Sequence, residues 1–326
     1  MILFNENEIR QHVHVNQKTI AVIEEAFASL AANKVTMPPI MRVDIPENNG
    51  EVDVKTAYIR GLDKFCIKIS AGFFNNPQLG LPSGNGMMLL VSTVTGVPQA
   101  VFLDNGYLTD VRTAAAGAVA AKYLARETVE TVGVIGTGGQ ARHQLKALKQ
   151  IRDFQRITIY GPTQSRAEIF AREMRETLGV ETNLFTSPEA VVKESHVVIT
   201  TTPAKTPIIK AEWLHPGLHI TAMGSDAEHK QELEAGVFGQ ADVVACDVKS
   251  QCFRLGELHH ALEQGTITKD HNIIELGELT SKQRAGRTND QQITICDLTG
   301  TGVQDTAIAL FAYDELVAQG LGLRIE

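Results

Sequence analysis

A glycine-rich turn between a strand-like and a helix-like segment constrains this chain most. An apolar run at residues 131–135 leads into Gly136-Thr-Gly138-Gly139-Gln140-Ala141, and a helix-forming stretch follows to residue 150. Gly136 permits a tight turn, Gly138 lets the backbone approach a pyrophosphate, and the small Ala141 lets the helix pack on the strand. Helix N-termini favour anions. The pattern predicts a dinucleotide site, although similar glycines also serve ordinary strand-to-helix turns.

The segments after this turn alternate between strand-like and helix-like patterns. A second strand arrives about one βαβ unit later, as a dinucleotide fold requires. Strands are expected at residues 132–136, 157–160, 197–201, 219–223, 243–246 and 293–298. This alternation predicts a Rossmann-type, doubly wound parallel sheet with helices on both faces.

The first third of the chain has a different pattern and predicts a separate domain. A helix is expected at 16–33, with strands at 56–59, 65–70, 86–94 and 98–104. An Ala-rich helix at 109–126 connects the domains, and a terminal helix at 303–319 is expected to fold back onto the first one. We therefore expect an α/β protein with a dinucleotide domain at 113–302 and a smaller, discontinuous α+β domain for substrate binding and dimerisation at 1–112 and 303–326.

Composition narrows the class of protein. The chain has 326 residues, 43% of them hydrophobic, enough for two domains with cores. Its net charge of -8 and the lack of a dense basic block argue against a nucleic-acid partner. The polar N-terminus does not resemble a signal peptide, and no segment is long and apolar enough for a membrane span. Four scattered cysteines suggest buried free thiols in a reducing compartment, so we expect a cytoplasmic protein.

Neither a metal site nor a nucleophile motif is expected. The pairs His259-His260 and His12-x-His14 lack partners at metal-ligand spacing, so surface or loop positions are the simpler interpretation. A Gly-x-Ser-x-Gly elbow is also missing.

Four motifs follow one another along the chain and identify a family. They are Asp104-Asn-Gly-Tyr-Leu-Thr-Asp-Val-Arg112-Thr113, the turn Gly136 to Ala141, Thr200-Thr-Thr-Pro203, and Met223-Gly-Ser-Asp226 continuing to Leu233, with Gly302-Val-Gln-Asp305 before the last helix. In these motifs the chain resembles the ornithine cyclodeaminase/μ-crystallin family over essentially its full length. The resemblance implies an NAD(P)-dependent enzyme that interconverts amino acids and imines, and a homodimer joined through the N-terminal domain.

The resemblance implies three basic substrate residues. Arg42, Lys68 and Arg112 fall where the family grips the substrate α-carboxylate. A carboxylate in a partly dry cleft needs cationic donors, and arginine offers a planar fork for bidentate pairing. Without the family, Lys68 would be taken for an exposed strand lysine and Arg112 for a solvated helix-end arginine.

The expected catalytic residues are Asp226 and Lys68. Asp226 matches the family's catalytic carboxylate and follows an expected strand, where open α/β sheets place ligand groups. A carboxylate near the reacting carbon can accept the proton that an amine loses before its α-hydrogen leaves as hydride. On its own, an Asp in Gly-Ser-Asp would more often be a turn or N-cap residue.

Cofactor contacts follow from the same resemblance. Gly136, Gly138, Gly139, Gln140 and Ala141 would hold the pyrophosphate, Ser83 and Thr113 match positions near the nicotinamide, and Thr201 lies in the segment that would pass over the adenosine half. Residues 160–166 contain no carboxylate for the ribose hydroxyls, and Thr163 and Arg166 could donate to a 2′-phosphate. NADP(H) is therefore slightly favoured over NAD(H), unless Arg166 faces solvent.

Lys55 departs from the family in a way that bears on substrate. Ornithine-cyclising members carry a glutamate there for the distal amino group, and a lysine should repel a diamine's ammonium. Around Lys55 and residues 80–86 the chain also looks like the branch linked to ectoine utilisation. The sequence thus favours an imino-acid (ketimine) reductase or amino-acid dehydrogenase, with the alanine dehydrogenase-like branch among the candidates, acting on a substrate with a carboxylate or neutral tail. A true cyclodeaminase and a catalytically silent NADPH-binding protein are the alternatives.

Overall fold

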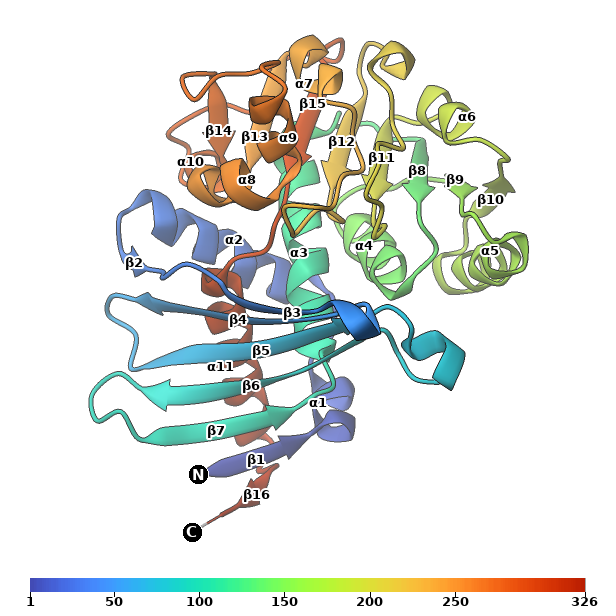
Figure 1. Cartoon of the computed structure of the whole chain (residues 1–326). Coiled ribbons are helices and arrows are strands. Elements are labelled where there is room, and N and C mark those ends of the chain that lie inside the picture. Colours follow the sequence, from blue (N-terminus) through green and yellow to red (C-terminus); the bar gives the residue numbers. More distant parts are fainter. Residues whose placement is uncertain (326) are drawn as a thin grey trace. The chain divides into compact units, whose positions relative to one another are not determined.

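The computed structural model describes residues 1–325 and divides into two compact units (Figure 1). The first unit comprises residues 1–113 together with the segment that begins at Thr301, and the second comprises Ala114–Gly300. No helix among the described residues is long and apolar enough to cross a membrane.

The first unit is built on an eight-stranded sheet in the order β16-β1-β7-β6-β5-β4-β2, with β3 paired to β4. All pairs are antiparallel except β1 with β7. Its strands are β1 (Ile2–Asn5), β2 (Val35–Thr36), β3 (Met41–Ile45), β4 (Gly50–Ile59), β5 (Lys64–Phe73), β6 (Gly84–Ser92), β7 (Pro98–Leu103) and β16 (Leu323–Arg324). Its helices are α1 (Glu6–His12), α2 (Gln17–Ala31), α3 (Tyr107–Leu124) up to Thr113, α11 (Gly302–Ala318) and the 3-10 turns η1 (Pro46–Asn48) and η2 (Asn76–Leu79).

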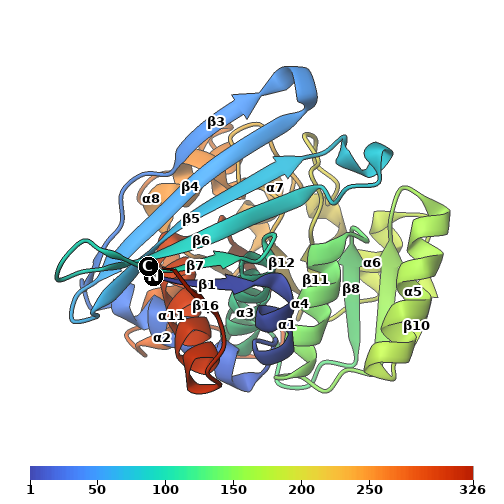
Figure 2. The ribbon, with the colours of Figure 1, turned by 90° about the horizontal axis from the view of Figure 1, so that it is seen from below.

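The terminal helix α11 packs on the first unit, which confirms the expectation that it folds back. It contacts α2, β4 and β5, and Figure 2 shows α2 and α11 on the same side of the sheet. A Cβ on Gly302 would lie 2.3 Å from the Thr56 carbonyl oxygen, so only glycine lets the helix begin this close to β4. The Thr306 hydroxyl donates to the Ala57 carbonyl at 2.7 Å and accepts from the Cys66 amide at 3.1 Å. The first turn of α11 is thereby fixed against β4 and β5.

The two faces of this sheet differ because side chains alternate along each strand. On the face toward α2 and α11, buried residues include Phe4, Ala57, Cys66, Leu90 and Phe102. The opposite face is also apolar, but Met41, Val43 and Ile69 on it are 59%, 51% and 40% exposed. One face therefore forms the core of the unit, and the other presents apolar side chains to solvent.

The second unit contains an eight-stranded, fully parallel sheet in the order β10-β9-β8-β11-β12-β15-β13-β14. Its strands are β8 (Thr131–Ile135), β9 (Arg156–Tyr160), β10 (Glu181–Leu184), β11 (Val197–Thr200), β12 (His219–Ala222), β13 (Val243–Cys246), β14 (Ile273–Glu275) and β15 (Thr294–Asp297). Its helices, besides the rest of α3, are α4 (Gly139–Lys149), α5 (Gln164–Leu178), α6 (Pro188–Lys193), η3 (Ala211–Trp213), α7 (Gly236–Gln240), α8 (Lys249–Leu255), α9 (Glu257–Glu263) and α10 (Leu276–Thr280).

Separate hydrophobic clusters cover the two faces of this parallel sheet. Val134 packs in the cluster that contains Leu145 of α4 and Phe170 of α5, whereas its neighbour Ile135 packs in the cluster with Phe238 of α7 and Leu258 of α9. Helices on both faces make this a doubly wound sheet, so the expected Rossmann-type fold is confirmed. The four cysteines are buried free thiols, as expected.

Candidate functional site

The glycine turn has the conformation that its sequence predicts. Gly136 ends β8 with φ +105°, a value that L side chains rarely adopt, and its amide donates to the Tyr160 carbonyl at 3.0 Å. A Cβ at this position would lie 2.9 Å from Thr201 Oγ1. Ala141, one turn into α4, is fully buried, so a larger side chain would push the helix from the strand. The chain therefore turns sharply where β8 meets α4.

The N-terminus of α4 offers a cradle for an anion. Gly138 is the N-cap residue, no side chain caps the helix, and a Cβ built on Gly138 or Gly139 would meet no atom within 4 Å. Backbone amides at such a terminus are donors without a helical acceptor, and the helix dipole favours negative charge. Thr201 Oγ1, beside Gly136, is buried without a hydrogen-bond partner among the described residues. These residues fit the pyrophosphate of a dinucleotide.

Arg142 fixes the shape of this turn, and the sequence interpretation missed it. Its guanidinium donates to the carbonyls of Thr137 and Gly138 at 2.8 and 3.0 Å, and to Glu173 of α5 at 2.7 Å. These bonds hold the loop carbonyls on the arginine side of the turn. An arginine four residues after the second glycine of the motif, at helical spacing, was the available signal.

The other expected cofactor residues lie in different places. Gln140 accepts from the Gln144 side chain at 3.1 Å, while Thr163 and Arg166 are exposed at the start of α5. Ser83 and Thr113 belong to the first unit, where the Ser83 carbonyl accepts from Phe73 at 2.8 Å. Their roles toward a cofactor stay predictions.

In the first unit, two of the expected substrate residues converge on one carboxylate. Lys68 Nζ of β5 lies 3.1 Å from Asp305 Oδ2, and Arg112 Nε of α3 lies 2.9 Å from Asp305 Oδ1. All three side chains are buried, with exposed fractions of 1%, 6% and 0%. The contacts are ion pairs by distance but lack the angles of hydrogen bonds. Lys68 is therefore not an exposed strand lysine and Arg112 is not a solvated helix-end arginine, as the sequence without the family resemblance would suggest.

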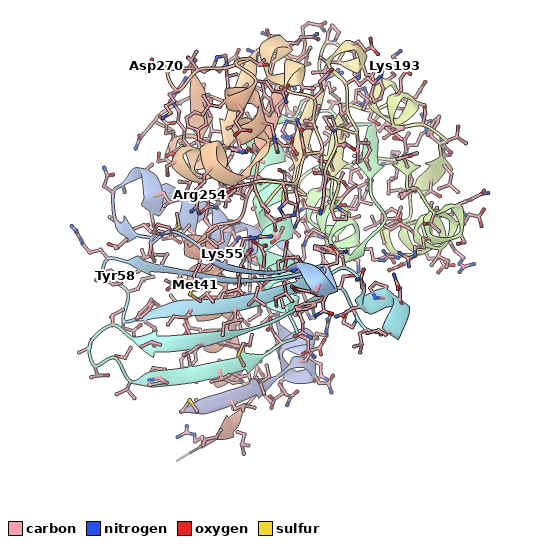
Figure 3. The ribbon with its side chains drawn as sticks, in the orientation of Figure 1. Met41, Lys55, Tyr58, Lys193, Arg254 and Asp270 are labelled. Carbon is pink, nitrogen blue, oxygen red and sulfur yellow. The ribbon has the colours of Figure 1, made fainter. Side chains whose placement is uncertain are left out.

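Lys55 belongs to the same buried face. It lies directly across from Lys68 in the β4–β5 register, is 5% exposed, and is labelled on β4 in Figure 3. Burial, the Arg112 charge and the Lys55 charge lower the pKa of Lys68 to about 7, although Asp305 acts in the opposite direction. Keeping these side chains charged on this face of the sheet therefore costs free energy, which a bound anion would offset.

Arg42 has a different environment. Its guanidinium pairs with Asp44 at 2.9 Å, with Asp53 at 3.5 Å, and with Glu51. Three carboxylates already offset its charge, so its contact with a substrate carboxylate stays a prediction.

The loop after β12 carries Asp226 and is held by buried polar groups. Lys230 Nζ donates to Asp226 Oδ1 at 2.7 Å, and the Ser225 hydroxyl donates to the Lys230 carbonyl at 2.5 Å. Beneath the loop, the buried Glu232 carboxylate accepts from the Gly224 amide at 2.8 Å and from Thr200 and Thr202 at 2.6 Å. Burial raises the pKa of Glu232. Glu232 thus ties the Asp226 loop to the Thr200–Thr202 segment, a role that sequence alone did not reveal.

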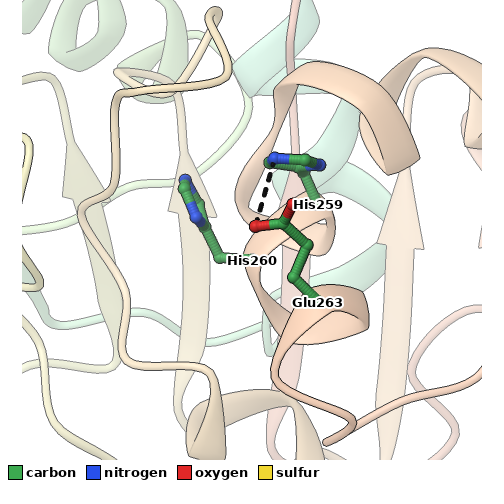
Figure 4. Close-up of side chains that lie close together, drawn as sticks. All are labelled: His259, His260 and Glu263. Carbon is green, nitrogen blue, oxygen red and sulfur yellow. Dashed lines mark ion pairs between the residues drawn. The ribbon is translucent and has the colours of Figure 1, made fainter.

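His259, His260 and Glu263 of α9 bring donor atoms within 4.8 Å of one another (Figure 4). His259 Nε2 lies 3.5 Å from Glu263 Oε2, and His259 Nδ1 contacts the Phe253 carbonyl at 3.3 Å. His260 Nε2 is bonded to the Lys230 carbonyl at 2.8 Å. One nitrogen of each ring thus contacts a backbone carbonyl. The contact of His260 with Lys230 supports the loop that carries Asp226.

A doubly wound sheet with an open glycine cradle at the N-terminus of a helix is typical of an NAD(P)-dependent oxidoreductase. The model of the Ornithine cyclodeaminase/mu-crystallin family matches residues 2–320. The chain belongs to this family.

Three known proteins illustrate the similarity. A putative dehydrogenase of Rhizobium meliloti is 50% identical over 326 residues, covering 100% of this chain and 99% of that protein. The structure of Thermococcus litoralis Δ1-pyrroline-2-carboxylate reductase in complex with NADH and L-proline matches with a TM-score of 0.95, 28% identity and full coverage of both chains. An archaeal alanine dehydrogenase dimer with bound NAD matches with a TM-score of 0.92 and 32% identity, covering 100% of this chain and 99% of that one.

We expect Gly138→Val to weaken NADH binding about tenfold or more without destabilising the protein. The new side chain points into open space rather than into protein, so it fills the cradle and leaves the fold intact. NADH fluorescence titration and thermal unfolding measure the two effects. Gly239→Val, at an exposed position of α7, is the control. Unchanged NADH affinity in Gly138→Val would show that the pyrophosphate does not lie at this turn.

Proposed function

We propose that the chain reduces a small 2-imino acid to an amino acid, or runs the reverse oxidation. The buried pair of Lys68 and Arg112 carries this proposal, because two desolvated cations on one carboxylate suit the α-carboxylate of such a substrate. The related structures bind NADH with L-proline in one case and NAD in the other, which supports the same chemistry here.

The residues would divide the work as follows. Lys68 and Arg112 hold the α-carboxylate and so orient the α-carbon. The glycine cradle would hold a nicotinamide dinucleotide, which would supply or take up the hydride. Asp226 exchanges a proton with the substrate nitrogen, and Lys230, which donates to its carboxylate, holds it in place.

A substrate panel separates this proposal from its two alternatives. The panel contains pyruvate with ammonia or methylamine, a cyclic 2-imino acid, and ornithine. NADH oxidation with the imines supports the reductase, whereas ammonia release from ornithine with catalytic NAD and no net NADH identifies a cyclodeaminase. NADPH binding with no turnover of any member would identify a silent binding protein.

Asp226→Asn should lower kcat by about 10²–10⁴-fold, because the amide cannot accept the proton, while NADH affinity changes little. Asp270→Asn, at an exposed position of the same unit, is the control. Steady-state kinetics and NADH titration measure both quantities. Wild-type turnover in Asp226→Asn would remove this residue from the mechanism.

We infer that NADPH binds at least as tightly as NADH. No acid lies in residues 160–166 to repel a 2′-phosphate, and the exposed Thr163 and Arg166 are at the N-terminal end of α5.

Arg166→Ala should then weaken NADPH binding by about 1.5–3 kcal/mol, the worth of a charge-assisted contact, and leave NADH binding unchanged. Arg172→Ala, exposed on the same helix, serves as the matched control. Fluorescence titration of both cofactors measures the difference. If the ratio of NADPH to NADH affinity is the same in Arg166→Ala as in the unchanged protein, this guanidinium does not contact the cofactor.

We also infer that the substrate tail is neutral or carries a carboxylate. Lys55 lies across from Lys68 and is buried, so a diamine's terminal ammonium near it would be repelled by a cation of the protein.

Lys55→Glu should raise kcat/KM for ornithine or lysine and lower it for acidic or short substrates. Repulsion between two cations about 4–6 Å apart costs about 2–4 kcal/mol at an effective dielectric near 20, or roughly tens- to hundreds-fold in specificity. Kinetics of both proteins on the same panel measure the change. Efficient ornithine cyclisation by the unchanged chain, with no response to Lys55→Glu, would restore the cyclodeaminase as first choice.

A homodimer through the first unit is the third part of the proposal. Rungs of apolar side chains cross the face of its sheet that α2 and α11 leave open: Met41, Val54, Ile69 and Met87 form one, and Ile67, Leu89, Val101 and Leu3 form the next. An apolar face of this extent typically marks a protein interface. A second copy is the favoured partner because the related alanine dehydrogenase is a dimer.

Ile69→Asp should convert the dimer into a monomer, because a carboxylate would be buried without a partner at the interface. Light scattering after size-exclusion chromatography measures the mass, and Val94→Asp, at a position 81% exposed, is the control. A monomeric unchanged protein, or a dimeric Ile69→Asp, would contradict this interface.

A cytoplasmic location completes the proposal. It rests on the four buried thiols, which remain unpaired and are typical of a reducing compartment.

A further inference from the structure

We propose that Asp305 is a positioning residue, which holds Lys68 and Arg112 in the charged, paired arrangement that receives the substrate carboxylate. The inference rests on the proposed function, in which those two cations bind the α-carboxylate. Asp305 itself would not touch the substrate.

The geometry gives each cation its own oxygen of a single carboxylate. Asp305 Oδ2 lies 3.1 Å from Lys68 Nζ and Oδ1 lies 2.9 Å from Arg112 Nε. A buried carboxylate with one cation beside each oxygen sets the separation of the two cations. The bridge joins a strand, β5, to two helices, α3 and α11, that are far apart in sequence.

Asp305 is held in place by its own element. It is fully buried in the first turn of α11, where the helix dipole stabilises a negative charge. The same turn is fixed against β4 and β5 by Gly302 and by the Thr306 hydroxyl. The carboxylate is therefore delivered to Lys68 by contacts that do not depend on a bound ligand.

The charges around Lys68 explain why this carboxylate is needed. Lys68 faces Lys55 from β4, Arg112 from α3, Asp305 from α11, and Asp104 from the end of β7, with the thiol of Cys66 on its own strand. Burial raises the pKa of Asp104 to about 6, and its carboxylate is engaged by the Gly106 and Leu108 amides. The pKa of Lys68 is about 7 with Asp305 in place, and Asp305 raises it against burial and the charges of Arg112 and Lys55. Without Asp305 the pKa of Lys68 would fall further, and Lys68 would lose its proton below neutral pH.

The sign of the effect separates this proposal from simple electrostatics. Removing a negative charge beside a carboxylate site should strengthen the binding of an anion if the cations stay unchanged. If Asp305 maintains those cations, its removal should weaken that binding instead. The weakening should disappear as the pH falls and Lys68 regains its proton.

The test compares Asp305→Asn, Lys68→Met and the double variant, with Asp314→Asn, exposed on the same helix, as the control. Pyruvate binding to each protein with saturating NADH is measured by calorimetry at about pH 6 and about pH 8, on either side of the Lys68 pKa of about 7. This readout needs no turnover. NADH affinity and thermal unfolding are recorded for each protein.

At the higher pH we expect Asp305→Asn to weaken pyruvate binding about tenfold or more, with much of the loss recovered at the lower pH and NADH affinity unchanged. The losses of the two single variants should not add in the double variant, because Asp305 acts in part through Lys68. Tighter binding in Asp305→Asn, a loss that does not depend on pH, or additive losses in the double variant would overturn the proposal.

Two further outcomes keep the inference distinct from the proposed function. If the unchanged protein does not bind pyruvate, or Lys68→Met binds it normally, the carboxylate role of Lys68 fails and the inference fails with it. If Lys68→Met is impaired but Asp305→Asn is not, only the inference fails. Should Asp305→Asn not fold, Asp305→Glu decides the matter: it retains the charge, so its binding should keep the pH dependence of the unchanged protein, and loss of that dependence would contradict the proposal.

Discussion

The burial of Lys68 and Arg112 around a single carboxylate is the constraint on which the first unit depends. Isolated charges are costly to remove from water, so the two cations need an anion whose position is fixed. Asp305 meets that need, and it comes from a helix at the other end of the chain. The discontinuous unit meets this requirement: the chain returns, after the whole parallel sheet, and places α11 against β4 and β5.

The second unit solves a related problem with backbone amides instead of cations. The space beside Gly138 and Gly139, at the N-terminus of α4, is open, and Arg142 donates to the carbonyls of Thr137 and Gly138 in the preceding loop. Buried acids then anchor the loops at the carboxyl ends of the strands. Glu232 joins the Asp226 loop to Thr200 and Thr202, and Glu257 accepts from the amides of Glu232 and Leu233. The segment from Gly224 to Asp226 is therefore fixed by the buried Glu232 carboxylate, although its sequence suggests a flexible loop.

Local patterns predicted much of this structure. The strand, glycine turn and helix at 131–150 are encoded by neighbouring residues, as are the alternation of the parallel sheet and the terminal helix, so sequence sufficed for the fold class. The short strands β1, β2, β3, β10, β14 and β16 were not predicted, because a few residues carry too little pattern. Contacts between residues far apart in the sequence could not be predicted from these local patterns. Lys68 lies on a strand whose pattern allows either face, and only the pairing with Asp305 accounts for its burial. The acids around Arg42 and the Glu232 anchor depend on sheet register and loop packing, which spacing along the chain does not specify.

The transfer of label from the cofactor tests the central claim most directly. NADH carrying deuterium at the transferable position of nicotinamide C4 is incubated with the chain, pyruvate and ammonia, and the product is analysed by mass spectrometry and proton NMR. Reduction of a 2-imino acid predicts alanine with a single deuterium, located at the α-carbon. Deuterium elsewhere in the product, or alanine formed without label from fully labelled cofactor, would contradict hydride transfer to the substrate α-carbon.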